Sequence, residues 1–552
     1  MSRTELRCLR NPGSGVTRQR DLASVVWTAA DGRRAYVAAM SVLAVAAAFL
    51  SAPADASNAA TAVGRLSVTV TDGKSNALLP CRVHLTAGGK VIYAPGCPRY
   101  ERDADFCCDG RFEVDVPAGP VEMLLEKGPE WPSRAETLNL PAATTTTLER
   151  TLERWIDMNA EGWFSGDLHV HRPPADVPLL MRAEDLNVAP VLTHWNQQHL
   201  KGEPPYLVEA AGDKEATHKR RPRVFHTLNQ EDERIGGAIL LFNLREPILR
   251  DGVYRHWPSG MAYHRAALGQ PGVHVEVEKP FWWEAPVHVA LGKVSSIGIV
   301  HNHYQRRGLM DNEAWGRARD TAQYPGPPGF CRYTLDLYYR YLNLGWEIAG
   351  TAGSASGVLQ SPLGYSRTYV RMDAFDYGGW WEALRAGRNV STNGPMIFAT
   401  VNDQPVGARF AVGAGESFDA IVRLDVRCRD PLDRAEIVVG GKVAATARPL
   451  PGDPRRIRAE ERLSLDRSSW IAVRAFQTGE TPFRFAHTSP FYVRVGDAKP
   501  HDPEAARFFV QWIDELIDRM KTDRDKFRSE EHYQEVIETY GQARAVYARL
   551  AE

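Results

Sequence analysis

Apolar and polar positions alternate with period two towards both ends of the chain. Alternation of this kind places one set of side chains on each face of a strand, and it occurs over 65–71 and 111–116. We therefore expect an N-terminal β-sandwich over residues 63–150. The same alternation over 420–426 predicts a second, C-terminal β-sandwich over residues 396–497.

The pattern changes between residues 155 and 395, where short apolar runs alternate with helical stretches. The apolar runs are 188–193, 238–242 and 296–300, and the helical stretches are 332–343 and 377–386. This order is typical of an α/β barrel or a doubly wound sheet. Apolar residues at helical spacing over 506–517 and 530–550 predict a helical tail, 503–552, that packs on the rest of the protein.

Length, charge and the N-terminal residues narrow the class of protein. A chain of 552 residues is too long for one core, and a net charge of −1 gives no reason to expect a nucleic acid as partner.

Arg33 and Arg34 precede a short apolar run, 35–50, which small residues follow up to Ala56. We interpret 1–56 as an export signal, because the run is shorter than the ~20 residues of a bilayer span. The protein is then periplasmic or secreted, and an uncleaved N-terminal membrane anchor is the alternative.

Four of the seven cysteines lie close together in the sequence. Cys81, Cys97, Cys107 and Cys108 share one short segment, and an even number of cysteines in an exported domain favours one or two disulfides. Their spacing does not reveal which of them pair.

The segment Asp167-Leu-His-Val-His171 carries the clearest chemical signal. In a strand, Asp167, His169 and His171 project from one face, while Leu168 and Val170 point the other way into a core. Two imidazoles and a carboxylate that converge at a strand end suit a divalent metal of borderline softness.

Other predicted strands end in residues of the same kind. His194 follows the run 188–192, Glu231 lies in the polar stretch 228–233, and His301 and His303 follow the run 296–300. Five of the 16 histidines therefore lie at these strand ends. In an α/β barrel the carboxyl ends of the strands meet at one mouth, so we expect a metal site there.

The chain resembles a known family at this point. The D-L-H-x-H opening at 167–171 is similar to that of the PHP superfamily of metal-dependent hydrolases. The later segments 279–283, 312–316, 352–357, 364–367 and 387–395 resemble the CehA/McbA (carbaryl-hydrolase-like) branch. The resemblance implies a distorted (β/α)7 barrel over 155–395 that hydrolyses an ester, carbamate, amide or phosphoester bond. The N-terminal sandwich resembles the prealbumin-like modules that precede catalytic domains in secreted hydrolases.

The resemblance also implies a set of metal ligands. They are His169, His171, His194, Glu231 as a bridging carboxylate, and His303. The chain departs from the family pattern in three places. A histidine often follows the glutamate motif near a glycine, but residues 236–238 supply none. Thr193 stands where the second motif has an aspartate, and Ala355 and Gly357 stand where the last motif, G-S-D-x-H, has its two ligands. We therefore expect one divalent metal rather than a cluster, with zinc as the first choice and manganese or iron as alternatives.

The remaining site residues have roles that the sequence leaves open. Asp167, Glu231 or His194 would move a proton during catalysis, and Asp167 alternatively orients a ligating imidazole. Arg367 lies near the altered last motif and would hold an anionic group of the substrate, although a structural ion pair explains it equally well. His301 is a second candidate for contact with the substrate.

Three functions are compatible with these residues. The first is an exported, mononuclear metallohydrolase that acts on a small molecule, with a glycan or an aryl ester as candidate substrates. The second is a catalytically inactive relative that retains a metal or ligand pocket. The third is a surface carbohydrate-binding protein built on the sandwiches. A membrane would be a partner only if the N-terminal segment stays uncleaved, and the oligomeric state stays open.

Overall fold

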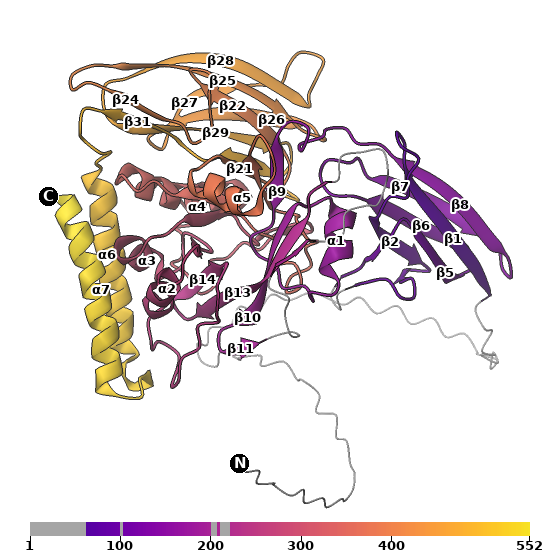
Figure 1. The fold of residues 1–552 in the computed structure, drawn as a ribbon, viewed down its shortest axis with the longest axis horizontal. Helices are drawn as coiled ribbons and strands as arrows, with labels where there is room; N and C mark the ends of the chain where they lie inside the picture. The colour runs from indigo at the N-terminus through magenta and orange to yellow at the C-terminus, as the bar shows by residue number, and fades with distance from the viewer. Residues whose placement is uncertain (1–61, 100–102, 200–206, 210–220) are drawn as a thin grey trace, which may run out of the picture. The chain divides into compact units, whose positions relative to one another are not determined.

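The computed structural model describes residues 62–99, 103–199, 207–209 and 221–552. Within these ranges the protein is a β-rich, mixed α/β chain with seven α-helices and several sheets (Figure 1). The prediction of a β-rich, multidomain α/β fold is confirmed at this level. The predicted export signal, 1–56, lies outside the described residues. Among the helices that are described, none is long and apolar enough to cross a membrane.

Two sheets near the N-terminus share one apolar core. The strands are β1 (Val63–Asp72), β2 (Cys81–Ala87), β3 (Lys90–Val91), β4 (Phe106–Cys108), β5 (Arg111–Pro117), β6 (Gly119–Glu126), β7 (Arg134–Leu140) and β8 (Thr145–Leu152). One sheet has the order β5-β1-β8 and the other β3-β2-β6-β7, with β4 paired to β2. Leu66 and Val114 from the first sheet and Val83 from the second lie in the same buried cluster. The alternating residues of 65–71 and 111–116 thus form the strands that the sequence predicts.

The cysteines of β2 and β4 separate into two environments. Cys81 and Cys108 face each other across the antiparallel pair, with their Sγ atoms 3.7 Å apart in the sandwich core. Cys107 lies in a different apolar cluster, together with residues of helix α1 (Val177–Glu184). Adjacent residues of a strand point to opposite faces, so the neighbouring thiols of Cys107 and Cys108 do not compete for one partner.

We expect an oxidising glutathione buffer to link Cys81 to Cys108. Each oxidised glutathione would convert this thiol pair to a disulfide and release two molecules of reduced glutathione. Peptide mapping without reduction should recover the Cys81–Cys108 link, and Cys107→Ser should leave it intact. Recovery of a link through Cys107 instead would contradict this assignment.

A ring of strands forms the central part of the protein. They are β9 (Trp163–Gly166), β10 (Val188–Trp195), β13 (Val224–Arg234), β14 (Gly237–Phe242), β15 (His274–Val277), β16 (Ser296–Val300) and β19 (Ala349–Ala352). Neighbours in this order pair with each other, and all pairs are parallel except those of β14.

Residues 167–171 close the ring. Strand β9 ends at Gly166, but the chain continues between two neighbours. The Asp167 amide donates to the carbonyl of Val188 on β10 at 3.2 Å, and the Leu168 amide donates to the carbonyl of Ala352 on β19 at 3.2 Å. The segment that carries the two histidines is therefore held by backbone hydrogen bonds on both sides.

A second pair of β-sheet layers follows the ring. Its strands include β22 (Met396–Val401), β25 (Phe418–Arg427), β26 (Leu432–Val439), β28 (Arg456–Leu465), β29 (Ser469–Gln477) and β31 (Phe491–Val495). One layer is a separate sheet that contains β22, β25 and β28; in the other layer, β26, β29 and β31 pair with one another and belong to the same continuous sheet as the ring. Val422 and Ile471, one from each layer, lie in a shared buried cluster.

The helices largely match their predicted ranges. Helix α4 (Gly326–Asn343) begins six residues before the predicted start, because proline fits the first turn of a helix. Helices α5 (Tyr377–Arg385), α6 (Pro503–Thr522) and α7 (Glu530–Ala551) agree closely with prediction. Trp512 of α6 and Tyr547 of α7 are buried in the same cluster as Tyr338 of α4. The C-terminal helices thus share a core with the central strands, as expected.

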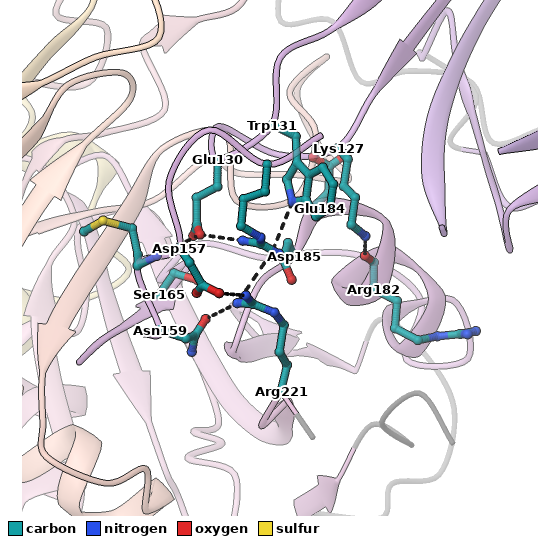
Figure 2. A network of polar contacts seen from close by, with 12 residues as sticks. Lys127, Glu130, Trp131, Asp157, Asn159, Ser165, Arg182, Glu184, Asp185 and Arg221 are labelled. Atoms are coloured by element: carbon teal, nitrogen blue, oxygen red, sulfur yellow. Dashed lines mark hydrogen bonds and ion pairs between the residues drawn. The ribbon is translucent and has the colours of Figure 1, made fainter. Parts of the chain in front are cut away.

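Buried charges join the N-terminal sheets to the central ring (Figure 2). Asp185, at the end of α1, accepts hydrogen bonds from Trp131 Nε1 at 3.3 Å, from Arg223 Nη2 at 3.1 Å, and from Arg154. Arg154 also donates to Glu130 Oε2 at 2.6 Å. Burial of so many charges is tolerated because each has a partner of opposite sign.

Candidate metal centre

Three of the predicted residues form one compact group. His169, His171 and Glu231 each offer a ligand atom within 4.8 Å of the others, and it is the one such group found in the described part of the chain. The Nε2 atoms of the two histidines are 3.1 Å apart. Glu231 Oε2 lies 3.0 Å from His171 Nε2 and 3.6 Å from His169 Nε2. All three residues are buried.

Local sequence and strand pairing explain this convergence. Leu168 and Val170 are fully buried in two separate apolar clusters, so the histidines between them turn to the opposite side. Glu231 lies on β13, directly opposite Trp195 in the register of the parallel pair β10 and β13. The Trp195 ring also packs against His171 at 5.1 Å between centroids.

The spacing fits a tetrahedral metal ion. Zinc bonds of about 2.0–2.1 Å with tetrahedral angles separate neighbouring ligand atoms by about 3.3 Å. The three measured separations, 3.0, 3.1 and 3.6 Å, lie on both sides of that value. Two imidazoles and one carboxylate also make a donor set that zinc uses in hydrolases, with the fourth position left for water.

The pKa shifts show how strongly the group favours a positive charge. Burial alone would lower the pKa of His169, but Glu231 and Glu278 raise it to about 10. Burial alone would raise the pKa of Glu231, but His169 and His171 lower it to about 2. The carboxylate thus stays ionised and stabilises a cation at the imidazoles.

Glu278 was not predicted as a site residue, yet it contacts this group. It follows β15, and its Oε1 lies 3.2 Å from His169 Nδ1. Its Oε2 accepts hydrogen bonds from Trp282 Nε1 at 2.9 Å and from Lys279 Nζ. A carboxylate on Nδ1 fixes the ring orientation and leaves Nε2 for a metal. Glu278 directly follows the short strand β15, and this position at a strand end is the one sequence feature that it shares with the predicted residues.

Glu233 is another carboxylate near the group. It follows Glu231 by two residues on β13, and it is partly exposed. Its Oε2 accepts a hydrogen bond from Trp195 Nε1 at 3.1 Å. Burial and the charge of Glu231 raise its pKa to about 7.

The side chain of Asp167 is buried and hydrogen-bonded on several sides, and it does not face an open site. Its carboxylate accepts hydrogen bonds from the amides of His169 at 3.1 Å, Ser354 at 2.9 Å and Gly364 at 2.7 Å, and from the Ser354 hydroxyl. These donors tie the histidine segment to the chain around Ser354. Of its two predicted roles, the contacts favour positioning.

His301 and His303 lie close to each other but outside the three-residue group. Their ring centroids are 5.2 Å apart, and both rings pack on Phe281, three residues after Glu278. Burial and the nearby Lys279 charge lower the pKa of His303 to about 3, so its ring is neutral. Neither His301 Nε2 nor His303 Nδ1 has a hydrogen-bond partner among the described residues.

His194 and Arg367 are not members of the three-residue group. His194 Nδ1 is 3.2 Å from the hydroxyl of Thr193, and its ring does not belong to the group. Arg367 is fully buried, and its Nε donates to the carbonyl of Gly364 at 2.7 Å.

The segment that replaces the last family motif packs tightly on the histidines. A Cβ atom at Gly353 would lie 2.6 Å from His169 Cβ, and one at Gly357 would lie 2.7 Å from the His171 backbone. The Ser356 hydroxyl accepts a hydrogen bond from Arg172 Nε at 2.8 Å. Small residues are needed here because the two backbones approach each other closely.

No model of a known protein family matches this chain, and no curated protein matches it either. What the site can do is therefore argued from its geometry and chemistry.

We expect Glu278→Gln to weaken zinc binding by about 10- to 100-fold, because partners of this kind orient a ligand without touching the metal. Competition with a chromophoric chelator measures the affinity, and circular dichroism checks that the protein is folded. Glu233→Gln is the matched control, since it removes a nearby charge but no contact with His169. Equal affinities of Glu278→Gln and the unmodified protein would refute the orienting role.

Proposed function

We propose that the protein is an exported, metal-dependent hydrolase with one metal ion held by His169, His171 and Glu231. The observation that carries this proposal is the spacing of their three ligand atoms, at 3.0–3.6 Å. The proposal includes a distorted (β/α)7 barrel of the PHP type, which the ring of mostly parallel strands supports. Zinc is the proposed metal, and a small molecule with an ester, carbamate, amide or phosphoester bond is the proposed substrate.

Each residue has a defined task in this proposal. A bound metal ion would lower the pKa of a water molecule and polarise the bond to be cleaved. Glu278 holds the Nδ1 side of His169, so that Nε2 faces Glu231. Asp167 fixes the backbone of the histidine segment through its four hydrogen bonds.

A substrate screen on the metal-loaded protein tests this function. Aryl esters, aryl carbamates and phosphoesters are offered with zinc, manganese or iron(II). We expect turnover of at least one class in the unmodified protein and in His226→Gln, which alters another buried histidine on β13. Turnover should be lost in His169→Ala. Turnover that survives in His169→Ala would contradict the proposal.

A catalytically inactive, metal-binding relative is the second candidate. The close packing of Gly353 and Gly357 on the histidines favours it, because this packing leaves little room for further ligands. Tight binding of one metal per chain without turnover in the screen would support this candidate over the first.

A further inference from the structure

A small cavity outside the metal centre is lined by five arginines. They are Arg82, Arg306, Arg367, Arg429 and Arg484. Its volume of about 60 Å³ is enough for a few water molecules or for one small oxyanion. The side chains come from the N-terminal sheets, the central part and the C-terminal sheets, and five guanidinium groups around so small a space need an explanation.

Three of these arginines, Arg82, Arg367 and Arg484, have a buried nitrogen with no hydrogen-bond partner among the described residues. Arg367 Nε and Nη2 donate to the backbone carbonyls of Gly364 and Glu184, at 2.7 and 3.2 Å. Its Nη1 has no hydrogen-bond partner within the described chain. Arg82 Nε also has no hydrogen-bond partner among the described residues, and the carboxylate oxygen Asp105 Oδ2 is 4.0 Å away from it. A buried donor without a partner is costly, so an acceptor in the cavity would stabilise these groups.

The charges around the cavity do not balance. Glu126, Glu184 and Asp430 are the carboxylates in its lining, which leaves an excess of two positive charges. Asp105, just outside the lining, reduces the excess to one. Burial and the neighbouring Arg82 lower the pKa of Arg306, as expected where positive charge is in excess.

We propose that this cavity binds a small, phosphate-class oxyanion. Guanidinium groups present planar pairs of donors that match the oxygens of phosphate or sulfate. Such an anion would satisfy the unpartnered nitrogens and neutralise the excess charge. Gly364 lines the cavity and donates its amide to Asp167 at 2.7 Å, so the anion would lie behind the histidine segment rather than at the metal.

Calorimetric titration of the full chain with inorganic phosphate tests this site. We expect one binding event with a Kd below about 1 mM, whereas chloride gives none. Binding should persist after removal of metal with a chelator and in His169→Ala. These two measurements test the anion site independently of the proposed function. If the metal centre does not exist, phosphate binding is still expected. Glycerol phosphate, titrated in parallel, distinguishes a free ion from a phosphorylated molecule as the natural source.

Two substitutions that change the charge around the cavity in opposite directions complete the test. Arg484→Gln removes a partly exposed guanidinium and should weaken phosphate binding by about tenfold. Asp430→Asn removes a carboxylate that faces Arg484 at 3.0 Å and should strengthen binding severalfold. Absence of phosphate binding to the unmodified protein, or equal weakening by both substitutions, would overturn the proposal.

Discussion

His169→Ala is expected to reduce bound metal from about one ion per chain to almost none. The substitution removes one of three ligand atoms and the imidazole that Glu278 orients. It also leaves Glu231 and Glu278, both buried, without their shared cationic partner. We expect the affinity for zinc to fall by more than about 100-fold, the upper range for loss of an orienting partner alone.

Elemental analysis of purified protein and a chelator competition measure this result. His226→Gln is the control, because His226 is buried on β13 and hydrogen-bonded to Asn229 but lies outside the group. It should retain about one metal ion per chain. A metal content in His169→Ala equal to that of the control would show that the ion binds elsewhere.

The strands and helices were largely predictable because their signals are local. Alternation over 65–71 and 420–426 gives the strands β1 and β25, since one face of each is buried and the other is solvated. The start of α4 was less visible. Its first turn contains prolines, which usually argue against a helix but are compatible with its beginning.

The metal centre was predictable only in part. His169 and His171 are two residues apart on one extended segment, so alternation alone brings their rings together. Glu231 joins them through the register of neighbouring strands. His303 also follows the end of a strand, yet it lies outside the group. A position at a strand end predicts the edge of the sheet where a residue lies, but not its distance from other residues at that edge. Glu278 acts through a contact between β15 and the histidine segment that no local pattern encodes.

Asp185→Asn is expected to destabilise the protein by about 3–5 kcal/mol, because it removes a negative charge from a buried ion network and leaves the positive charges in place. Arg223 would keep a buried charge without its carboxylate partner, and Arg154 would be left with Glu130 alone. Asparagine is a close replacement otherwise. Asp185 has a positive φ of 56°, a conformation that asparagine tolerates as well as aspartate does.

Asp403→Asn is the matched control for this substitution. Asp403 also has a positive φ, 63°, but its side chain is 80% exposed and pairs with Arg423 at the surface. We expect a change within about 1 kcal/mol, the range for exposed ion pairs. Urea unfolding measures the free energy of unfolding of both variants, and equal losses would contradict a special role for the buried network.

The effect of Asp185→Asn should also depend on pH. Burial alone would raise the pKa of Asp185, but Arg154 and the neighbouring cations hold it well below its ordinary value. A carboxyl group with a lowered pKa in the folded state stabilises the protein above its unfolded pKa of about 3.9 and loses that contribution as the pH falls. The difference between the unmodified protein and Asp185→Asn should therefore be constant from pH 7 to 5 and shrink below about pH 4. A difference that stays constant down to pH 3 would mean that the charge of Asp185 is not what stabilises the network.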